Sequence, residues 1–246
     1  MDLTILGADG TYPRAHSACS GYLLQHDGFN LWMDAGNGTL SFLQEHIALD
    51  QIDAIFVSHA HVDHCADIYP FFYQLINTRK TVPLYAASCV YDNLKPLIGS
   101  GSQQDFADLF EWHLLHAGDA ADAGPFRLNV FNAAHSIENA TVRIQADGRT
   151  LCYSGDTGPN PELAVAARGA DLFLCEASWL EQDEGLMEPI HLKAAEAGAV
   201  AREADIERLM LTHVWPRNPL DRVREEASRT FDGTIEFARE TQKTTI

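Results

Sequence analysis

The sequence predicts an α/β fold in which two sheets pack on each other and helices lie outside them. Short apolar runs separated by Gly, Pro, Asn and Asp dominate residues 3–57 and again residues 112–153. Segments that read as helices follow each of these strand-rich blocks. The repeated order of strands and then helices predicts two βα halves of one layered structure.

In the first half we expect strands over residues 3–7, 19–25, 31–33, 54–57 and 82–86, and helices over 66–78 and 91–98. The second of these helices is stopped by Gly99-Ser100-Gly101. In the second half we expect strands over 112–115, 126–133, 141–145, 151–153, 172–175 and 209–211, and helices over 162–167, 192–203 and 220–230. Asp147-Gly148 predicts a hairpin turn between two of these strands.

Length and composition indicate one domain, residues 1–246. A chain of 246 residues with 46% hydrophobic residues can bury a full core, and no Pro- or Gly-rich linker divides it. Five widely spaced cysteines without a CxxC pair argue against a disulfide framework.

The charge balance limits the kinds of molecule that the protein is expected to bind. The net charge of −18 repels polyanions, so nucleic acid and anionic membranes are not expected to bind over an extended surface. The N-terminal residues lack the features of a signal peptide, and no apolar stretch is long enough to span a bilayer. We therefore expect a cytoplasmic protein.

The densest group of metal-binding side chains follows the predicted strand 54–57. The segment from Ser58 to His64 contains His59, His61, Asp63 and His64. Imidazole nitrogen and carboxylate oxygen are the ligands that Zn²⁺ and similar divalent ions prefer. The spacing therefore predicts one part of a metal site.

Three further polar residues end apolar runs, where a sheet can project them toward one rim. They are His135, Asp156 and His213. Taken singly, each is better explained as a satisfied core or rim residue. Together with the histidine segment they make seven candidate ligands, which suits two ions if Asp156 bridges them.

These motifs resemble the metallo-β-lactamase superfamily of binuclear hydrolases over nearly the whole chain. The resemblance implies a four-layer αβ/βα sandwich with the site on the rim between the sheets. It also implies that one ion is held by His59, His61 and His135 and the other by Asp63, His64 and His213, with Asp156 bridging.

Within the superfamily the chain looks like the ribonuclease Z-like branch. The segments that carry this resemblance are residues 3–7, 20–24, 175–179 and 191–198. Residues 63–67 and 153–213 are similar to actinobacterial phosphodiesterases that hydrolyse cyclic nucleotides. The chain lacks an obvious basic, glycine-rich arm of the kind that tRNA-processing members use. Antibiotic-hydrolysing β-lactamases resemble it only at the first ligands.

The resemblance implies a phosphodiesterase acting on small phosphodiesters such as 3′,5′-cyclic nucleotides, through a hydroxide that bridges two metal ions. Zinc is the first choice of metal, and manganese and iron accept the same ligands. Asp63 would ligate and also orient the hydroxide. His191 would protonate the leaving alkoxide or contact the phosphate, and Glu176 would fix its tautomer. A helix-end role for His191 and a structural role for Glu176 stay open.

Other roles also stay open: a ribonuclease Z-type tRNA 3′-end endonuclease, a thioester or lactone hydrolase, and a non-enzymatic metal-binding scaffold. The acidic balance counts against the first of these. Trp179, Trp215 and Arg217 follow ligand-bearing segments, so they offer aromatic faces and a guanidinium for a substrate, or simply pack at the rim. The family resemblance also leads us to expect a homodimer.

Overall fold

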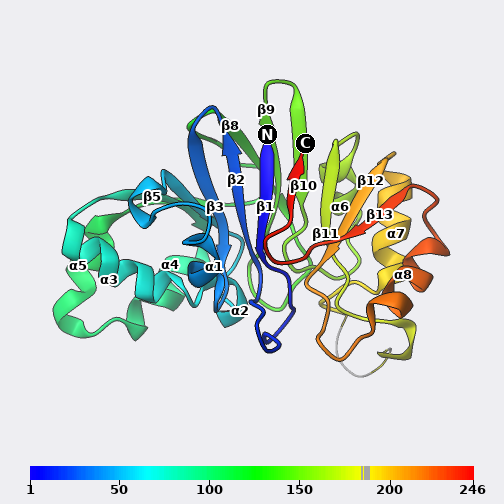
Figure 1. Cartoon of the computed structure of the whole chain (residues 1–246), viewed down its shortest axis with the longest axis horizontal. Coiled ribbons are helices and arrows are strands. Elements are labelled where there is room, and N and C mark those ends of the chain that lie inside the picture. The colour runs from blue at the N-terminus through cyan, green and yellow to red at the C-terminus, as the bar shows by residue number, and fades with distance from the viewer. Residues whose placement is uncertain (184, 186–188) are drawn as a thin grey trace.

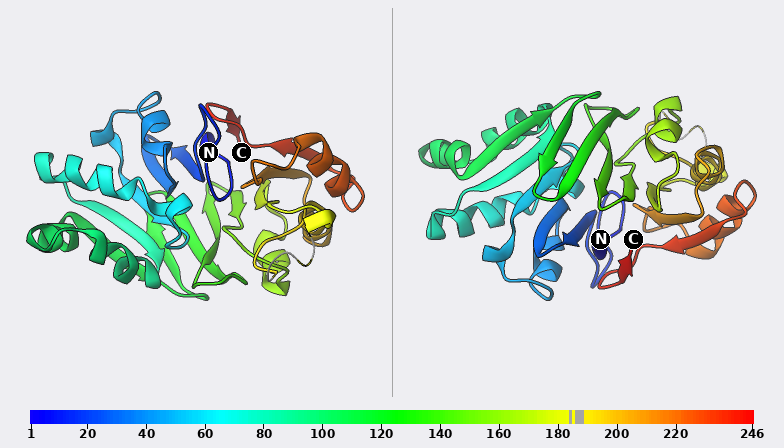
Figure 2. Two further views of the ribbon diagram at one scale, coloured as in Figure 1. Left: turned by 90° about the horizontal axis from the view of Figure 1, so that it is seen from below. Right: turned by 90° about the horizontal axis from the view of Figure 1, so that it is seen from above.

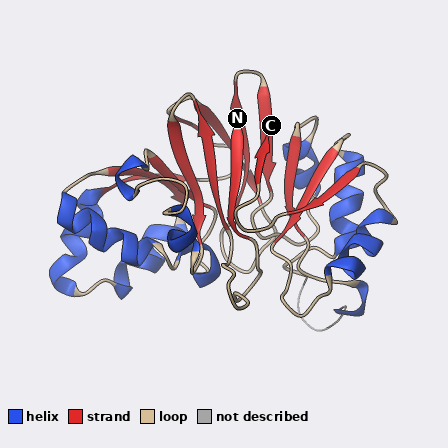
Figure 3. Ribbon diagram, viewed as in Figure 1, coloured by secondary structure: helices blue, strands red, loops and turns tan. Residues whose placement is uncertain are grey.

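Two sheets stand face to face at the centre of the computed structural model, which describes residues 1–183, 185 and 189–246. Helices cover the outer side of each sheet (Figures 1 and 3). The views from below and above show the same four layers, with the helices on opposite sides of the paired sheets (Figure 2). The predicted four-layer αβ/βα arrangement is therefore confirmed.

The first sheet is half antiparallel and half parallel. Its spatial order is β14 (Lys243–Thr245), β1 (Asp2–Gly7), β2 (Gly21–His26), β3 (Phe29–Ala35), β4 (Ala54–Val57), β5 (Val82–Ala87) and β6 (Phe110–Leu115). Neighbours from β14 to β3 are antiparallel, and neighbours from β3 to β6 are parallel. The two ends of the described chain lie side by side because β14 pairs with β1 (Figure 1).

The second sheet has the same mixed construction. Its spatial order is β13 (Thr234–Phe237), β12 (Arg208–Thr212), β11 (Leu172–Glu176), β10 (Arg149–Tyr153), β9 (Ala140–Ala146), β8 (Phe126–Asn132) and β7 (Ala120–Ala123). Strands β10 to β13 are parallel to one another, and β7 to β10 form antiparallel pairs.

Helices α1 (Thr39–Leu43), α3 (Ile68–Thr78), α4 (Cys89–Leu94) and α5 (Gln103–Leu109) lie beside the first sheet. Helices α6 (Pro161–Ala167), α7 (Ala194–Glu203) and α8 (Leu220–Ser228) lie beside the second. The short helix α2 (Val62–Cys65) lies at the lower rim in Figure 1. The 3₁₀ turns are η1 (Leu49–Gln51), η2 (Lys95–Leu97), η3 (Ser100–Ser102) and η4 (Glu181–Asp183). None of the described helices is long and apolar enough to cross a membrane.

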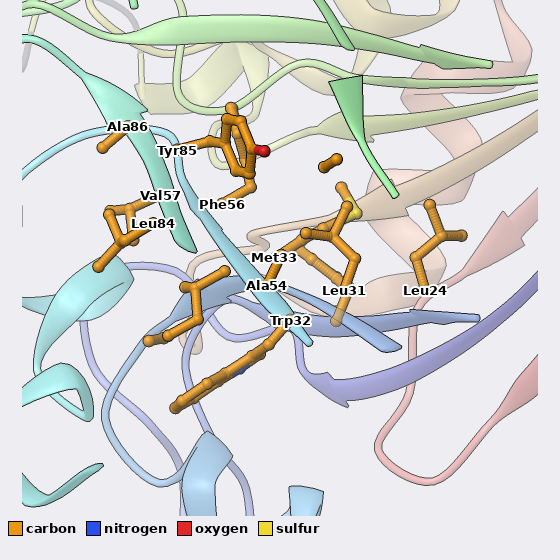
Figure 4. Packing of buried hydrophobic residues seen from close by; sticks show 14 of the residues in the cluster. Leu24, Leu31, Trp32, Met33, Ala54, Phe56, Val57, Leu84, Tyr85 and Ala86 are labelled. Atoms are coloured by element: carbon orange, nitrogen blue, oxygen red, sulfur yellow. The ribbon is translucent and has the colours of Figure 1, made fainter. Parts of the chain in front are cut away.

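The inner strands are largely apolar on both faces because both faces are buried. In β11, Leu172 and Leu174 belong to the core between the sheets, and Phe173 and Cys175 belong to the core under α6 to α8. Figure 4 shows the same alternation in the first sheet, where Trp32 lies on one side of the sheet. Its ring packs edge-on against Phe71 of α3, 5.7 Å away.

Some short elements differ from the prediction. The sequence analysis missed α1, α2, α5, β7, β13 and β14. The strand expected over 112–115 in the second half is β6, which pairs with β5 at the edge of the first sheet. The helix expected from residue 192 begins at Ala194 instead. Residues 192 and 193 are held extended because Trp179 forms a bridge with Lys193 and backbone bonds with Leu192 and Ala194.

Candidate metal centre

The predicted ligands meet at one rim of the sandwich because the strands that carry them end there. In the first sheet, β3 and β4 are parallel. In the second sheet, β10, β11 and β12 are parallel neighbours. β8 points the same way as β10, because β9 lies between them and is antiparallel to both. His59 follows β4, His135 follows β8, Asp156 follows β10 and His213 follows β12. Groups at the carboxyl ends of parallel strands share one edge, as in other open α/β sheets.

Three imidazoles form the first group. His61 Nδ1 lies 3.1 Å from His59 Nε2 and 3.0 Å from His135 Nε2. Asp156 Oδ2 lies 3.7 Å from His59 Nε2. Ligands with bonds of about 2.0–2.1 Å to a tetrahedral zinc ion lie about 3.3 Å from one another, so these separations suit a shared ion.

The second group contains two imidazoles and two carboxylates. His213 Nε2 lies 3.1 Å from Asp63 Oδ2 and 3.4 Å from Asp156 Oδ2. His64 Nε2 lies 3.2 Å from Asp156 Oδ1. Asp156 therefore belongs to both groups, and within each group the candidate ligand atoms lie within 4.8 Å of one another.

Two buried atoms at the centre of the cluster lie 3.2 Å from each other, but neither makes a hydrogen bond of good geometry. They are His64 Nε2 and Asp156 Oδ1. A buried polar atom without a partner is costly, and a divalent cation would satisfy both atoms. Together with the nitrogen and oxygen donor set, this shows that the cluster is suited to binding metal ions. Its two groups are the same two sets that the resemblance implies; ligation by each residue stays a prediction.

Outer hydrogen bonds orient four of the imidazoles. His64 Nδ1 donates to Asp34 Oδ2 at 2.7 Å, and His135 Nδ1 donates to the Ile190 carbonyl at 2.9 Å. Ser58 Oγ lies 3.1 Å from His59 Nδ1, and Ser178 Oγ lies 2.8 Å from His213 Nδ1. Contacts of this kind fix ring orientation and leave Nε2 directed at the ion.

The buried carboxylates concentrate negative charge in the site, and this charge must be balanced by positive charge. Burial lowers the pKa of His59 well below its usual value, which keeps this imidazole neutral and able to ligate. Burial acts in the same direction on His64, but Asp156 and Asp34 outweigh it and raise its pKa well above the usual value. A proton or a divalent cation at this position supplies the charge that the buried carboxylates require.

The backbone is unusual where it approaches the cluster. Asp34 and His213 have φ values of 52° and 51°, in the left-handed region that non-glycine residues seldom adopt. A side chain on Gly10 would place its Cβ 2.6 Å from the carbonyl oxygen of His213. Thr11, on the same loop, donates its backbone N–H to Asp63 Oδ2 at 2.8 Å. Gly10 and Thr11 thus lie directly against His213 and Asp63.

His191 and Glu176 lie beside the cluster and in contact with each other. His191 Nδ1 is 3.0 Å from Glu176 Oε1, so the predicted contact is present. The same carboxylate oxygen accepts the Thr157 N–H at 2.6 Å. Burial lowers the pKa of His191, but Glu176 and Asp156 raise it by more, to about 9. Because α7 begins at Ala194, His191 is not a helix-end residue.

A pocket of about 420 Å³ opens directly onto this cluster. His61, Asp63, Asp156 and His191 line its polar side. The rest of its wall is formed by Thr11, Val62, Ser178, Trp179 and Trp215. Pockets of about 300–1,000 Å³ are typical of small-molecule sites.

Residues 29–214 match the protein family described as Beta-lactamase superfamily domain. The chain belongs to this family. A Mycobacterium tuberculosis relative, named Uncharacterized protein Rv1339, is 34% identical over 95% of this chain and 88% of its own length. Ribonuclease Z of Methanopyrus kandleri is 27% identical, over 93% of this chain and 92% of its length.

The Bacillus subtilis protein named Probable metallo-hydrolase YhfI is 28% identical over 97% of both chains. Its crystal structure matches this fold with a TM-score of 0.89, at 27% identity, over 99% of this chain and 98% of that chain. Both YhfI and ribonuclease Z carry the names of hydrolytic enzymes. The predictions of a metallo-β-lactamase fold and of a metal-dependent hydrolase are therefore confirmed.

Asp34 and Ser178 are functional candidates that the sequence analysis missed. Asp34 Oδ2 also accepts hydrogen bonds from Ser58 Oγ at 2.8 Å and Tyr153 Oη at 2.6 Å. A signal for Asp34 did exist, since it ends the apolar run 31–33 in the same way that Asp156 ends its own. Ser178 had no such signal, because its importance depends on the fold of residues 176–213.

We expect Asp34→Asn to weaken zinc binding by about 10–100-fold, because His64 loses the carboxylate that orients its ring. Competition with a chromophoric chelator measures the dissociation constants. Asp53→Asn is a matched control, since Asp53 accepts the Asn30 N–H at 2.8 Å before β4 begins. Equal affinities in the wild type and Asp34→Asn would show that Asp34 does not support the metal centre.

Proposed function

We propose that this protein is a binuclear metal-dependent phosphodiesterase for small phosphodiesters, with a 3′,5′-cyclic nucleotide as the first candidate. The observation that carries the proposal is the position of the pocket. It is large enough for one nucleotide-sized molecule, at about 420 Å³, and its polar side is the histidine and carboxylate cluster. A phosphate in this pocket would lie against the candidate metal centre.

In this proposal His59, His61 and His135 hold one ion and Asp63, His64 and His213 hold the other, with Asp156 shared between them. Zinc fits the donor set best, and manganese and iron are alternatives. Two such ions supply activated water near neutral pH and neutralise charge on the phosphate.

The chain's own residues position the reactants. Asp63 lines the pocket, so its carboxylate can accept a hydrogen bond from the attacking water. His191 also lines the pocket, and its contact with Glu176 directs Nδ1 away from the substrate. In the reaction the water oxygen would bond to phosphorus as the water gives up a proton to solvent, one ester bond would break, and the leaving alkoxide would take a proton from His191, which regains it from solvent.

Ribonuclease Z activity is the second candidate, because a relative of that name aligns over most of the chain. The net charge of −18 disfavours it, since each phosphate of a precursor tRNA adds repulsion. Thioester hydrolysis would use the same cluster but leaves His191 without a leaving alkoxide to protonate. A homodimer and a cytoplasmic location stay predictions.

We expect the metal-loaded protein to hydrolyse cyclic nucleotides with a higher kcat/KM than precursor tRNA or a thioester. Chelation should abolish this activity and zinc, manganese or iron should restore it. The measurement is a panel of these metals against cyclic AMP, cyclic GMP, bis(p-nitrophenyl) phosphate, precursor tRNA and a thioester. Preferential cleavage of the tRNA, or of the thioester, would overturn the proposal.

We expect His191→Ala to lower kcat for a cyclic nucleotide by about 10²–10⁴-fold, because its alkoxide leaves poorly without a proton. Bis(p-nitrophenyl) phosphate should be slowed much less, since nitrophenolate needs no proton. His116→Ala is the control, because His116 also contacts a glutamate, Glu138, 3.1 Å away, but at an exposed position. Equal slowing of both substrates by His191→Ala would exclude the proton-donor role.

A further inference from the structure

One aromatic ring in the pocket wall, that of Trp215, is stacked against an arginine side chain. Trp215 lines the pocket. It lies in the segment after β12, two residues beyond His213. The guanidinium carbon of Arg217 lies 3.7 Å from the centre of the Trp215 ring, so a cation covers one face of the indole. Trp215 is among the residues that line the pocket and Arg217 is not. A guanidinium stacked on one face of an indole leaves the opposite face as the one that a planar group can contact.

A buried carboxylate fixes this arrangement. Arg217 Nη2 lies 2.6 Å from Asp183 Oδ1, and the Asp183 side chain is only 4% exposed. Asp183 Oδ2 accepts Asn218 Nδ2 at 3.1 Å. The Asn218 N–H donates to the Trp215 carbonyl at 2.7 Å. The ring and the backbone of Trp215 are thus held by the same network, which gives a rigid platform.

The platform is also tied to the metal centre. Asn218 Nδ2 donates to the Ser178 carbonyl at 2.9 Å, and Ser178 Oγ holds His213 at 2.8 Å. The position of the indole is therefore fixed relative to the cluster that would bind a phosphate.

The other tryptophan of the pocket is less suited to this task. Trp179 is 7% exposed, and its ring packs at 66° against His191, with 5.4 Å between the ring centres. The Trp179 ring therefore packs against His191 and is not available for a planar ligand to stack on. Val62, which is 68% exposed, adds apolar surface to the same pocket.

We propose that Trp215, backed by Arg217 and Asp183, is the platform on which the nucleobase of the substrate stacks while its phosphate lies at the histidine and carboxylate cluster. This inference rests on the proposed phosphodiesterase function and specifies its substrate as a nucleotide. Bases stack on aromatic side chains whatever their sequence, and the larger purine ring overlaps an indole more fully than a pyrimidine. Arg217 and Asp183 act as positioning residues.

The test compares two ligands that differ in the base. Calorimetry with the zinc-loaded protein measures the affinities of adenosine 5′-monophosphate and of ribose 5-phosphate, which lacks the base. We expect Trp215→Leu to lower the ratio of the two affinities by about tenfold or more, and Trp215→Phe, which keeps an aromatic face, to retain most of it. Tyr73→Leu, an exposed aromatic on α3, is the control.

Two results would overturn the inference: an unchanged ratio in Trp215→Leu, or a wild-type protein that binds both ligands equally. Hydrolysis of cyclic nucleotides without any dependence on the base would overturn the platform and leave the proposed function intact. Base-dependent binding through Trp215 without hydrolysis of any phosphodiester would overturn the proposed function instead.

Discussion

The crowding of ionisable side chains at the rim between the sheets is the constraint on which the rest of the structure depends. Asp34, Asp156 and Glu176 are buried there among imidazoles, and His64 is buried between two of these carboxylates. Such a cluster is unfavourable unless each charge is paired and each polar atom is satisfied. Hydrogen bonds to the outer atoms satisfy part of this requirement, and divalent cations would satisfy the rest.

The fold meets the constraint with strand ends and a strained backbone. Parallel strands bring residues from distant parts of the chain to one edge, so no long loop is needed to assemble the cluster. Asp34 and His213 adopt left-handed φ values that cost about 1–3 kcal/mol each. Gly10 packs closely against His213, and Gly21 packs closely against the Asp34 carbonyl.

Most of the ligand cluster was predictable because its residues follow a simple physical pattern. Polar residues after buried strands, such as His135 and Asp156, are singly better explained by packing, and it is their recurrence beside the histidine segment 59–64 that predicts a shared site. The edge strands β13 and β14 were not predictable, because they are largely polar and owe their structure to pairing with β12 and β1. The bridge that keeps His191 out of α7 depends on Trp179, a contact that local sequence does not encode.

The sequence indicated Trp215 as an aromatic face for a substrate or as a packing residue, and it could not decide between the two roles. A tryptophan after a ligand-bearing strand more often packs than contacts a ligand, and the positions of Arg217 and Asp183 are what support the proposed platform. In the proposed platform, base recognition would depend on the same rim residues that contact the candidate metal ligands. Ser178 connects them, since its backbone contacts Asn218 and its side chain contacts His213.

The most direct measurement is a calorimetric titration of the chelator-stripped protein with zinc, repeated for Asp156→Ala. A binuclear centre bridged by Asp156 predicts saturation at two ions per chain in the wild type. It also predicts weaker binding of both ions in the variant, because Asp156 belongs to both ligand groups. Saturation of the wild type at a single ion, or unchanged binding in Asp156→Ala, would contradict the binuclear centre.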